Sequence, residues 1–273
     1  MRKASTWLVL FVVLAMALAV AGCSGSQPPA SESTSSSSSS TAPNPKLVTP
    51  GQITVGSDTS FPPFESMNGD VAEGFDVDLL TAIGKEAGLK VVFKTEVFDT
   101  LIPSLKAGGK FDVIASAMTI TDERKKEIDF SDPYIDSNQS IAMKKGSTFT
   151  SNDQFSGKKV GVQSGTTGEA WAKENLKGAT TVPFKTATEA FSALRAGSVE
   201  AVVNDLPVTA YIVKDPSLGI EIVKEVPTGE QYGFGVSKDN PDLLKAINDG
   251  LAKVKSSGEY DTIYKKWFGT TAQ

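Results

Sequence analysis

Short apolar segments alternate with amphipathic helical segments along the chain from residue 46 onward. Residues 74–88 carry apolar side chains at helical spacing and end in a glycine, whereas 52–57, 111–115 and 159–162 are short and apolar, as buried strands are. Repeated strand–helix–strand units predict α/β layers with mainly parallel sheets. Ligands of such sheets bind at the carboxyl ends of the strands, so the residues that follow each strand are candidates for a binding site.

The same patterns predict the remaining elements. Further strands are expected at 90–93, 199–203, 221–223 and 232–236, and further helices at 100–107, 122–128, 167–176, 188–196, 207–214, from 240 onward and around 260–268.

The composition excludes several classes of chemistry. The chain has 273 residues, a formal net charge of −5, no histidine and one cysteine. The acidic balance argues against nucleic-acid binding. Without histidine there is no Ser-His-Asp or Cys-His catalysis, and one cysteine forms neither an intramolecular disulfide nor a thiolate zinc site. We expect no catalytic residue, no metal and no cofactor. An enzyme would have to use carboxylates, lysine, tyrosine or serine.

Residues 1–22 have the order of a secretory signal. Two cations precede an apolar run from Trp7 to Ala21. This run is shorter than the ~20 residues that a membrane-spanning helix needs. The only cysteine, Cys23, follows at the expected cleavage point, which resembles a bacterial lipobox. The resemblance implies removal of 1–22 and lipidation of Cys23. The alternative is a short membrane anchor with a buried cysteine.

The segment 23–45 is mostly Ser, Thr and Pro, and Glu32 is its only charge. Such a segment has almost nothing to bury and cannot offset the entropy of ordering. We expect it to be a flexible tether between the lipid anchor and the folded part. The protein is then extracytoplasmic and anchored to the cell membrane, at a cell surface or in a periplasm.

Polar and aromatic residues gather near the ends of the expected strands. The helix expected from Thr167 begins with Thr166 and Glu169 at capping-box spacing, and its free N–H groups suit an anion. Arg124 offers a planar fork for a carboxylate, and Asp205 offers a counter-charge for an ammonium group. Aromatic walls are expected from Phe61 and Phe98. Together these features indicate a free α-amino acid as the ligand.

Six stretches resemble the polar-amino-acid family of bacterial solute-binding proteins that feed ABC importers. They are SDTSFPPFE (57–65), GFDVDLL (74–80), MTITDERKKEIDFSDPY (118–134), GVQSGTTGE (161–169), VVNDLP (202–207) and EYDTIYKKWFG (259–269). The resemblance implies a two-lobed periplasmic-binding-protein fold of type II. Each lobe would be a mainly parallel sheet flanked by helices, with a two-segment hinge. It also implies a membrane permease as partner, and we expect a monomer.

Lobe boundaries follow from this fold. We expect lobe 1 at 46–134 and 232–273, lobe 2 at 138–228, and hinge segments near 135–137 and 229–231. Closure of the lobes on the ligand would be the signal that the permease reads.

The resemblance assigns roles in the site. Arg124 would bind the α-carboxylate with the backbone N–H groups of Thr119 and Thr167, and Asp205 would bind the α-ammonium with the Thr119 hydroxyl and the Ala117 carbonyl. The ligand side chain would lie between the two aromatic residues. The full expected ligand-binding set is Asp58, Phe61, Phe98, Ser116, Ala117, Thr119, Arg124, Gln163, Thr166, Thr167, Asn204 and Asp205.

Each assignment has a structural alternative. Arg124 lies in a charged run whose side chains generally face solvent, Asp205 could cap the following helix, and Phe61 and Phe98 could be core residues. The stripe of aromatic residues at 260–268 is interpreted as core packing.

The ligand side chain is expected to donate hydrogen bonds, because Asp58 lies beside Gln163 and Asn204. Arginine or another basic amino acid fits the carboxylate as a charged partner, and glutamine fits through its amide. Glutamine-type sites of the family often carry a lysine where Gln163 stands, so the basic ligands rank above glutamine. Glutamate fits poorly, since no second cation is evident.

Three other functions stay open. One is a dehydratase on the same fold, with Asp58 as the acid. Another is the ligand-binding subunit of a sensor, and the third is a structural or adhesive lipoprotein. The paired charges of Arg124 and Asp205 favour simple capture of an amino acid.

Overall fold

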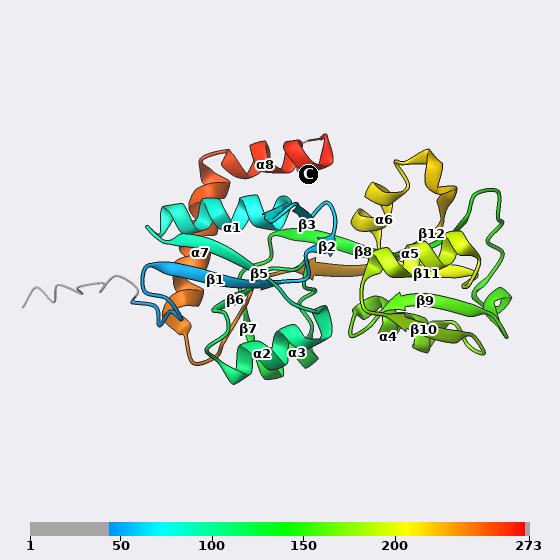
Figure 1. Cartoon of the computed structure of the whole chain (residues 1–273), viewed down its shortest axis with the longest axis horizontal. Helices are drawn as coiled ribbons and strands as arrows, with labels where there is room; N and C mark the ends of the chain where they lie inside the picture. Colours follow the sequence, from blue (N-terminus) through cyan, green and yellow to red (C-terminus); the bar gives the residue numbers. More distant parts are fainter. Residues whose placement is uncertain (1–43, 271–273) are drawn as a thin grey trace, which may run out of the picture. The chain divides into compact units, whose positions relative to one another are not determined.

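The computed structural model describes residues 44–270. The expected signal segment, Cys23 and almost all of the expected tether lie outside these residues. The described chain forms two five-stranded sheets and one three-stranded sheet, with helices packed around them (Figure 1). Among residues 44–270, no helix combines the length and the apolar character that a bilayer span requires.

The first sheet has the strand order β5-β1-β6-β13-β7. β1 pairs in parallel with β5 and β6, whereas β13 is antiparallel to β6 and β7. The strands are β1 (Gln52–Ser57), β5 (Lys90–Thr95), β6 (Val113–Ile114), β7 (Asp129–Phe130) and β13 (Gly235–Val236).

Two apolar clusters cover this sheet. The larger one joins β1 to α1 (Phe75–Glu86), α7 (Pro241–Ser256) and α8 (Glu259–Phe268). The smaller one joins β6 to α2 (Leu101–Ala107). In Figure 1, α1 and α8 accordingly lie above the sheet, and α2 lies below it with α3 (Asp122–Glu127).

The second sheet has the order β10-β9-β11-β8-β12. β9 pairs in parallel with β10 and β11, and β8 is antiparallel to β11 and β12. The elements are β8 (Ile135–Lys144), β9 (Lys159–Gln163), α4 (Thr167–Asn175), β10 (Thr180–Phe184), α5 (Ala187–Ala196), β11 (Ala201–Asp205), α6 (Leu206–Ile212) and β12 (Ile220–Tyr232). Residues of α4 and of α5 belong to separate apolar clusters on this sheet.

Two long antiparallel strands connect the sheets. β8 and β12 pair from Ile220 opposite Lys144 to Tyr232 opposite Ile135, with a register shift between Val226 and Glu230. Both segments expected to form the hinge, 135–137 and 229–231, lie within these strands. The small third sheet, β2 (Ser60–Phe61), β3 (Glu65–Asn68) and β4 (Val71–Glu73), follows β1 in the chain.

The sheets differ from the expected pattern in one respect. Each has two parallel and two antiparallel pairings, so they are mixed rather than mainly parallel. The antiparallel pairings all involve β8 or β13. These strands enter their sheets from the connecting segments and not from a strand–helix–strand unit, which is the source of parallel pairing.

Candidate functional site

Nine of the twelve residues expected to bind a ligand line one cavity. They come from both five-stranded sheets and their connections, as the rule for strand ends predicts. The open space among them is about 10 Å³, the size of one water molecule, so an amino acid enters only if these segments separate. The lining residues are Phe61, Phe98, Ala117, Thr119, Arg124, Gln163, Thr166, Thr167 and Asp205.

The guanidinium of Arg124 lies across this cavity. Its Nη1 donates to the Thr119 carbonyl at 2.7 Å, and its Nη2 donates to the Gly165 carbonyl at 3.1 Å. The guanidinium carbon lies 5.4 Å from the centre of the Phe98 ring, a cation–π contact. These contacts use two of the five N–H groups of the fork, and the charged group therefore has donors left for an anion.

The two aromatic residues are packed differently. Phe61 belongs to the main apolar cluster of the first sheet and is 7% exposed. Phe98 begins a 3-10 turn (Phe98–Thr100) and packs on the smaller cluster. Each residue thus packs on an apolar cluster and also lines the cavity, so the core alternative holds and the role as a ligand wall stays a prediction.

Three threonines line the cavity, and a glutamate lies behind two of them. Thr166 caps α4, since its hydroxyl accepts from the Glu169 N–H at 3.1 Å. Glu230 Oε2 accepts hydrogen bonds from the Thr167 hydroxyl at 3.0 Å and from the Thr119 hydroxyl at 3.3 Å. The sequence analysis missed Glu230, which lies on β12 where a hinge segment was expected.

Asp205 is the last residue of β11 and stands at the N-cap position of α6, but its side chain does not cap that helix. Its Oδ1 accepts from Gln139 Nε2 at 2.6 Å, and its Oδ2 accepts from the Tyr232 hydroxyl. Burial raises the pKa of Asp205 to about 7, and the nearby Glu230 adds to the rise. The two hydrogen bonds and the Arg124 charge oppose it. Asp205 is thus a carboxylate directed at the cavity and not at the helix.

Asp58 and Gln163 lie together at the other end of the site. Gln163 Nε2 donates to Asp58 Oδ2, and the Ser60 hydroxyl donates to Asp58 Oδ1 at 2.6 Å. Burial is the main reason that the pKa of Asp58 is raised. Only Gln163 of these residues lines the cavity. Asp58 lies directly behind it.

The two other expected residues do not line the cavity. The Ser116 hydroxyl accepts from the Asp58 N–H at 3.0 Å and donates to Glu65 Oε1 at 2.9 Å. The side chain of Asn204 points to the start of α6, with Nδ2 3.5 Å from the Thr209 hydroxyl. Ser116 therefore supports Asp58 from behind.

Two fully buried acids support the loop after β6. Asp76 Oδ2 accepts from the Ala117 N–H at 2.9 Å and from the Tyr134 hydroxyl at 2.8 Å. Ala117 has a φ of 44°, which is unfavourable for a residue with a Cβ, so this hydrogen bond helps to hold it. Burial raises the pKa of Asp76 to about 7 and that of Glu65 well above its usual value.

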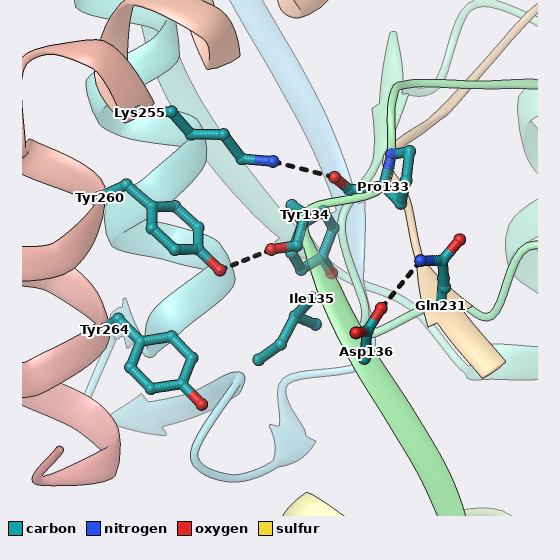
Figure 2. Close-up of a pocket in the computed structure, with 8 residues that line it drawn as sticks. All are labelled: Pro133, Tyr134, Ile135, Asp136, Gln231, Lys255, Tyr260 and Tyr264. Carbon is teal, nitrogen blue, oxygen red and sulfur yellow. Dashed lines mark hydrogen bonds between the residues drawn. The ribbon is translucent and has the colours of Figure 1, made fainter. Parts of the chain in front are cut away.

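A larger pocket of about 450 Å³ shares no residue with this cavity. Figure 2 shows that the Tyr260 hydroxyl donates to the Tyr134 carbonyl, Lys255 Nζ to the Pro133 carbonyl and Gln231 Nε2 to Asp136 Oδ1. Its polar groups thus join α7 and α8 to the start of β8. In the part of the chain that the structure describes, no group of three or more histidine, cysteine or acidic side chains is arranged to hold a metal ion.

A comparison with known families identifies the family of this chain. A family model described as "Bacterial extracellular solute-binding proteins, family 3" matches residues 53–270. The chain belongs to this family. The match spans both sheets and all the expected ligand-binding residues. The fold is that of the type II periplasmic binding proteins.

Proteins similar to this chain bind different amino acids. The glutamine-binding protein of an ABC transporter from Bacillus subtilis is 35% identical over 272 residues, which is 98% of this chain and 97% of that protein. An ancestral arginine-binding protein is 46% identical in structures bound to arginine and to glutamine, each with a TM-score of 0.76. These matches cover 80% and 81% of this chain, respectively, and 99% of the solved chains.

A further similar solved structure is connected with an enzyme. It is an ancestral amino acid-binding protein described as a precursor of cyclohexadienyl dehydratase, 41% identical with a TM-score of 0.74. The match covers 80% of this chain and 96% of that chain.

Proposed function

We propose that this protein captures a free polar or basic L-amino acid and presents it to the permease of an ABC importer. The observation that carries the proposal is the convergence of Arg124, Asp205 and two aromatic walls on one cavity. Arg124 would bind the α-carboxylate with the N–H groups of Thr119 and Thr167, and Asp205 would bind the α-ammonium. A half-buried positive group and a buried negative group in one cavity match a zwitterion.

The lobes of this proposal are 46–134 with 232–273, and 138–228. The hinge would be near 135–137 and 229–231. The ligand would stabilise the closed arrangement because it contacts Arg124 from one lobe and Asp205 from the other. The closed arrangement would then be the form that the permease recognises.

Arginine or another basic amino acid is the proposed ligand class, ahead of glutamine. Three carboxylates, those of Asp58, Asp205 and Glu230, lie in or directly behind the cavity, against the single guanidinium of Arg124. An extra positive charge on the ligand would offset this excess. The family relatives that bind arginine and glutamine support both ligands.

A thermal-shift panel of free amino acids tests the function. The protein is first unfolded and refolded to remove any ligand that copurifies. Stabilisation by arginine, lysine or glutamine, with calorimetric one-to-one binding, is expected. Stabilisation by leucine or glutamate but by none of these three contradicts the ligand class, and the absence of any stabilisation contradicts capture of an amino acid.

Lipidation of Cys23 is part of the proposal. The lipid would hold the protein on the outer side of the cell membrane, and residues 23–45 would serve as the tether. Expression in a bacterial host should place the wild type in the membrane fraction and a Cys23→Ala variant outside it. Equal fractionation of the two proteins contradicts lipid anchoring.

A dehydratase is the second candidate function. The raised pKa of Asp58 gives the site a carboxyl group that holds a proton more readily than usual, as an acid catalyst must. The likeness to a precursor of a dehydratase adds to this observation. Incubation with arogenate followed by detection of phenylalanine separates an enzyme from a binding protein.

A further inference from the structure

Glu230 lies directly behind the cavity lining, where it accepts hydrogen bonds from two lining threonines, although the ligand-binding motifs of the sequence do not include it. It lies at the end of β12, opposite Ser137 of β8. Three donors meet its Oε2: Gln139 Nε2 at 2.9 Å, Thr167 Oγ1 at 3.0 Å and Thr119 Oγ1 at 3.3 Å. One carboxylate therefore contacts the loop after β6, the strand β8 and the start of α4.

Glu230 and Asp205 are neighbours through a shared donor. Gln139 Nε2 donates to Asp205 Oδ1 at 2.6 Å as well as to Glu230 Oε2. Within residues 44–270, no lysine or arginine nitrogen approaches either carboxylate within 4.0 Å. Two adjacent carboxylates that share only neutral donors repel each other, and an ammonium group between them would remove this repulsion.

The hydroxyl of Thr119 also indicates a cation between the two carboxylates. A hydroxyl has one proton and two lone pairs. It can accept from an ammonium group when its own proton points toward another acceptor. Glu230 Oε2 is a charged acceptor for that proton at 3.3 Å, and the neutral Thr167 hydroxyl lies at 3.4 Å. Glu230 thus leaves the lone pairs of Thr119 available to a cation beside Asp205.

We infer that Glu230 acts with Asp205 as the counter-charge of the ligand's α-ammonium and orients the Thr119 hydroxyl toward it. This inference rests on the proposed function, because it concerns the same amino-acid ligand. It adds a second anionic group to the ammonium end of the site. The ligand's positive end is then held by a carboxylate from β12 and by a carboxylate from β11.

Calorimetry on two variants tests the inference. Glu230→Gln keeps an acceptor for the two hydroxyls and removes the charge. Glu225→Gln is the matched control, because Glu225 lies on the same strand with an exposed side chain. The titrants are L-arginine and 5-guanidinopentanoate, which is arginine without its α-amino group. If the wild type prefers glutamine, the titrants are L-glutamine and 4-carbamoylbutanoate.

The expected result is a loss of affinity only for the titrant that carries the α-amino group. Glu230→Gln should weaken L-arginine at least about tenfold, or ~1.4 kcal/mol, and leave 5-guanidinopentanoate unchanged. Glu225→Gln should bind both as the wild type does. Unchanged or tighter binding of L-arginine by Glu230→Gln overturns the inference. An equal loss of affinity for both titrants also overturns it, because such a loss would come from a disturbed structure and not from the α-amino group.

The titrant without an α-amino group could bind too weakly to measure. In that case, a crystal structure of the wild type with its bound L-amino acid tests the inference. A hydrogen bond between the α-nitrogen and the Glu230 carboxylate supports the inference, and a Glu230 carboxylate turned away from the α-nitrogen overturns it. If the wild type binds no amino acid at all, this result contradicts the proposed function. The role of Glu230 is contradicted only by a wild type that binds its ligand without this carboxylate.

Discussion

The Gln163 amide donates a hydrogen bond to the Asp58 carboxylate, although the two residues are 105 positions apart in the chain. Asp58 follows β1 of the first sheet, and Gln163 ends β9 of the second. The contact therefore joins the two sheets at the end of the cavity where the ligand side chain is proposed to lie. It also means that neutral donors, Gln163 and Ser60, are the present partners of the Asp58 carboxylate.

Removal of the Asp58 charge is expected to separate basic ligands from neutral ones. Asp58→Asn should weaken L-arginine at least about tenfold, because a charged hydrogen-bond partner is lost, and should affect L-glutamine less. Isothermal titration calorimetry measures both. Asp70→Asn, with an exposed side chain between β3 and β4, is the control. Unchanged arginine affinity in Asp58→Asn would exclude Asp58 as a partner of the ligand.

Loss of the guanidinium at position 124 is expected to remove binding almost entirely. Arg124→Ala should weaken the amino acid by about 100-fold or more, because a buried carboxylate would be left without its counter-charge. Arg124→Lys should retain part of the affinity, since lysine keeps the charge but not the fork. The exposed Arg195 offers Arg195→Ala as a control. Wild-type affinity in Arg124→Ala would contradict the site.

Ligand affinity is expected to rise with pH through neutrality. Asp205 has a pKa of about 7, raised by burial and by Glu230 and opposed by hydrogen bonds from Tyr232 and Gln139 and by the Arg124 charge. It binds an ammonium group only when it is ionised. The ionised fraction rises about tenfold between pH 6 and pH 8, so the affinity should rise by a similar factor.

Isothermal titration calorimetry at several pH values measures this change in affinity. The binding heat in buffers of different ionisation enthalpy gives the number of protons that Asp205 releases on binding. Asp205→Asn should bind weakly at every pH and lose this pH dependence. Affinity that is constant from pH 6 to pH 8 in the wild type would show that Asp205 is ionised throughout or does not contact the ligand.

The buried Asp76 is expected to make the free protein less stable as the pH rises. Its pKa is about 7 in the folded protein against an ordinary value of 3.8. The folded state therefore keeps a proton that the unfolded state releases, and the free energy of unfolding falls between about pH 4 and pH 7. Asp76→Asn should have a smaller slope and should be at least as stable as the wild type at pH 8.

Urea unfolding from pH 4.5 to pH 8 measures this slope. The exposed Asp70→Asn variant should follow the wild type at every pH. A steeper slope in Asp76→Asn than in the wild type would be inconsistent with a protonated Asp76. A uniform loss of stability in this variant would instead reflect the hydrogen bonds from Ala117 and Tyr134.

Several elements could be predicted because their signals are local. The helical spacing of 74–88 predicted α1, which spans Phe75–Glu86, and the segment 188–196 predicted α5, which spans Ala187–Ala196. Apolar periodicity, capping residues and terminal glycines act within a few turns of the chain, so they are readable without a partner. The residue types at the strand ends predicted an amino-acid site, and this stays a prediction.

The strand β8 had no such signal. Its sequence, IDSNQSIAMK, contains Ser137, Gln139 and Ser140, which are buried although they are polar. Their hydrogen-bond partners come from β11, β12 and α6, far along the chain. A hydrophobicity pattern does not detect a strand whose burial depends on such partners.

The sequence by itself determined the layered α/β class, the helices with local patterns and the charged and aromatic residues of the proposed amino-acid site. Only the tertiary structure decided which of them meet. It brought Glu230 and Gln139 to Asp205 and placed Ser116 and Asn204 outside the cavity lining. The reason is physical: a side chain's charge and shape are local properties, whereas its neighbours depend on strand register and on how the sheets pack.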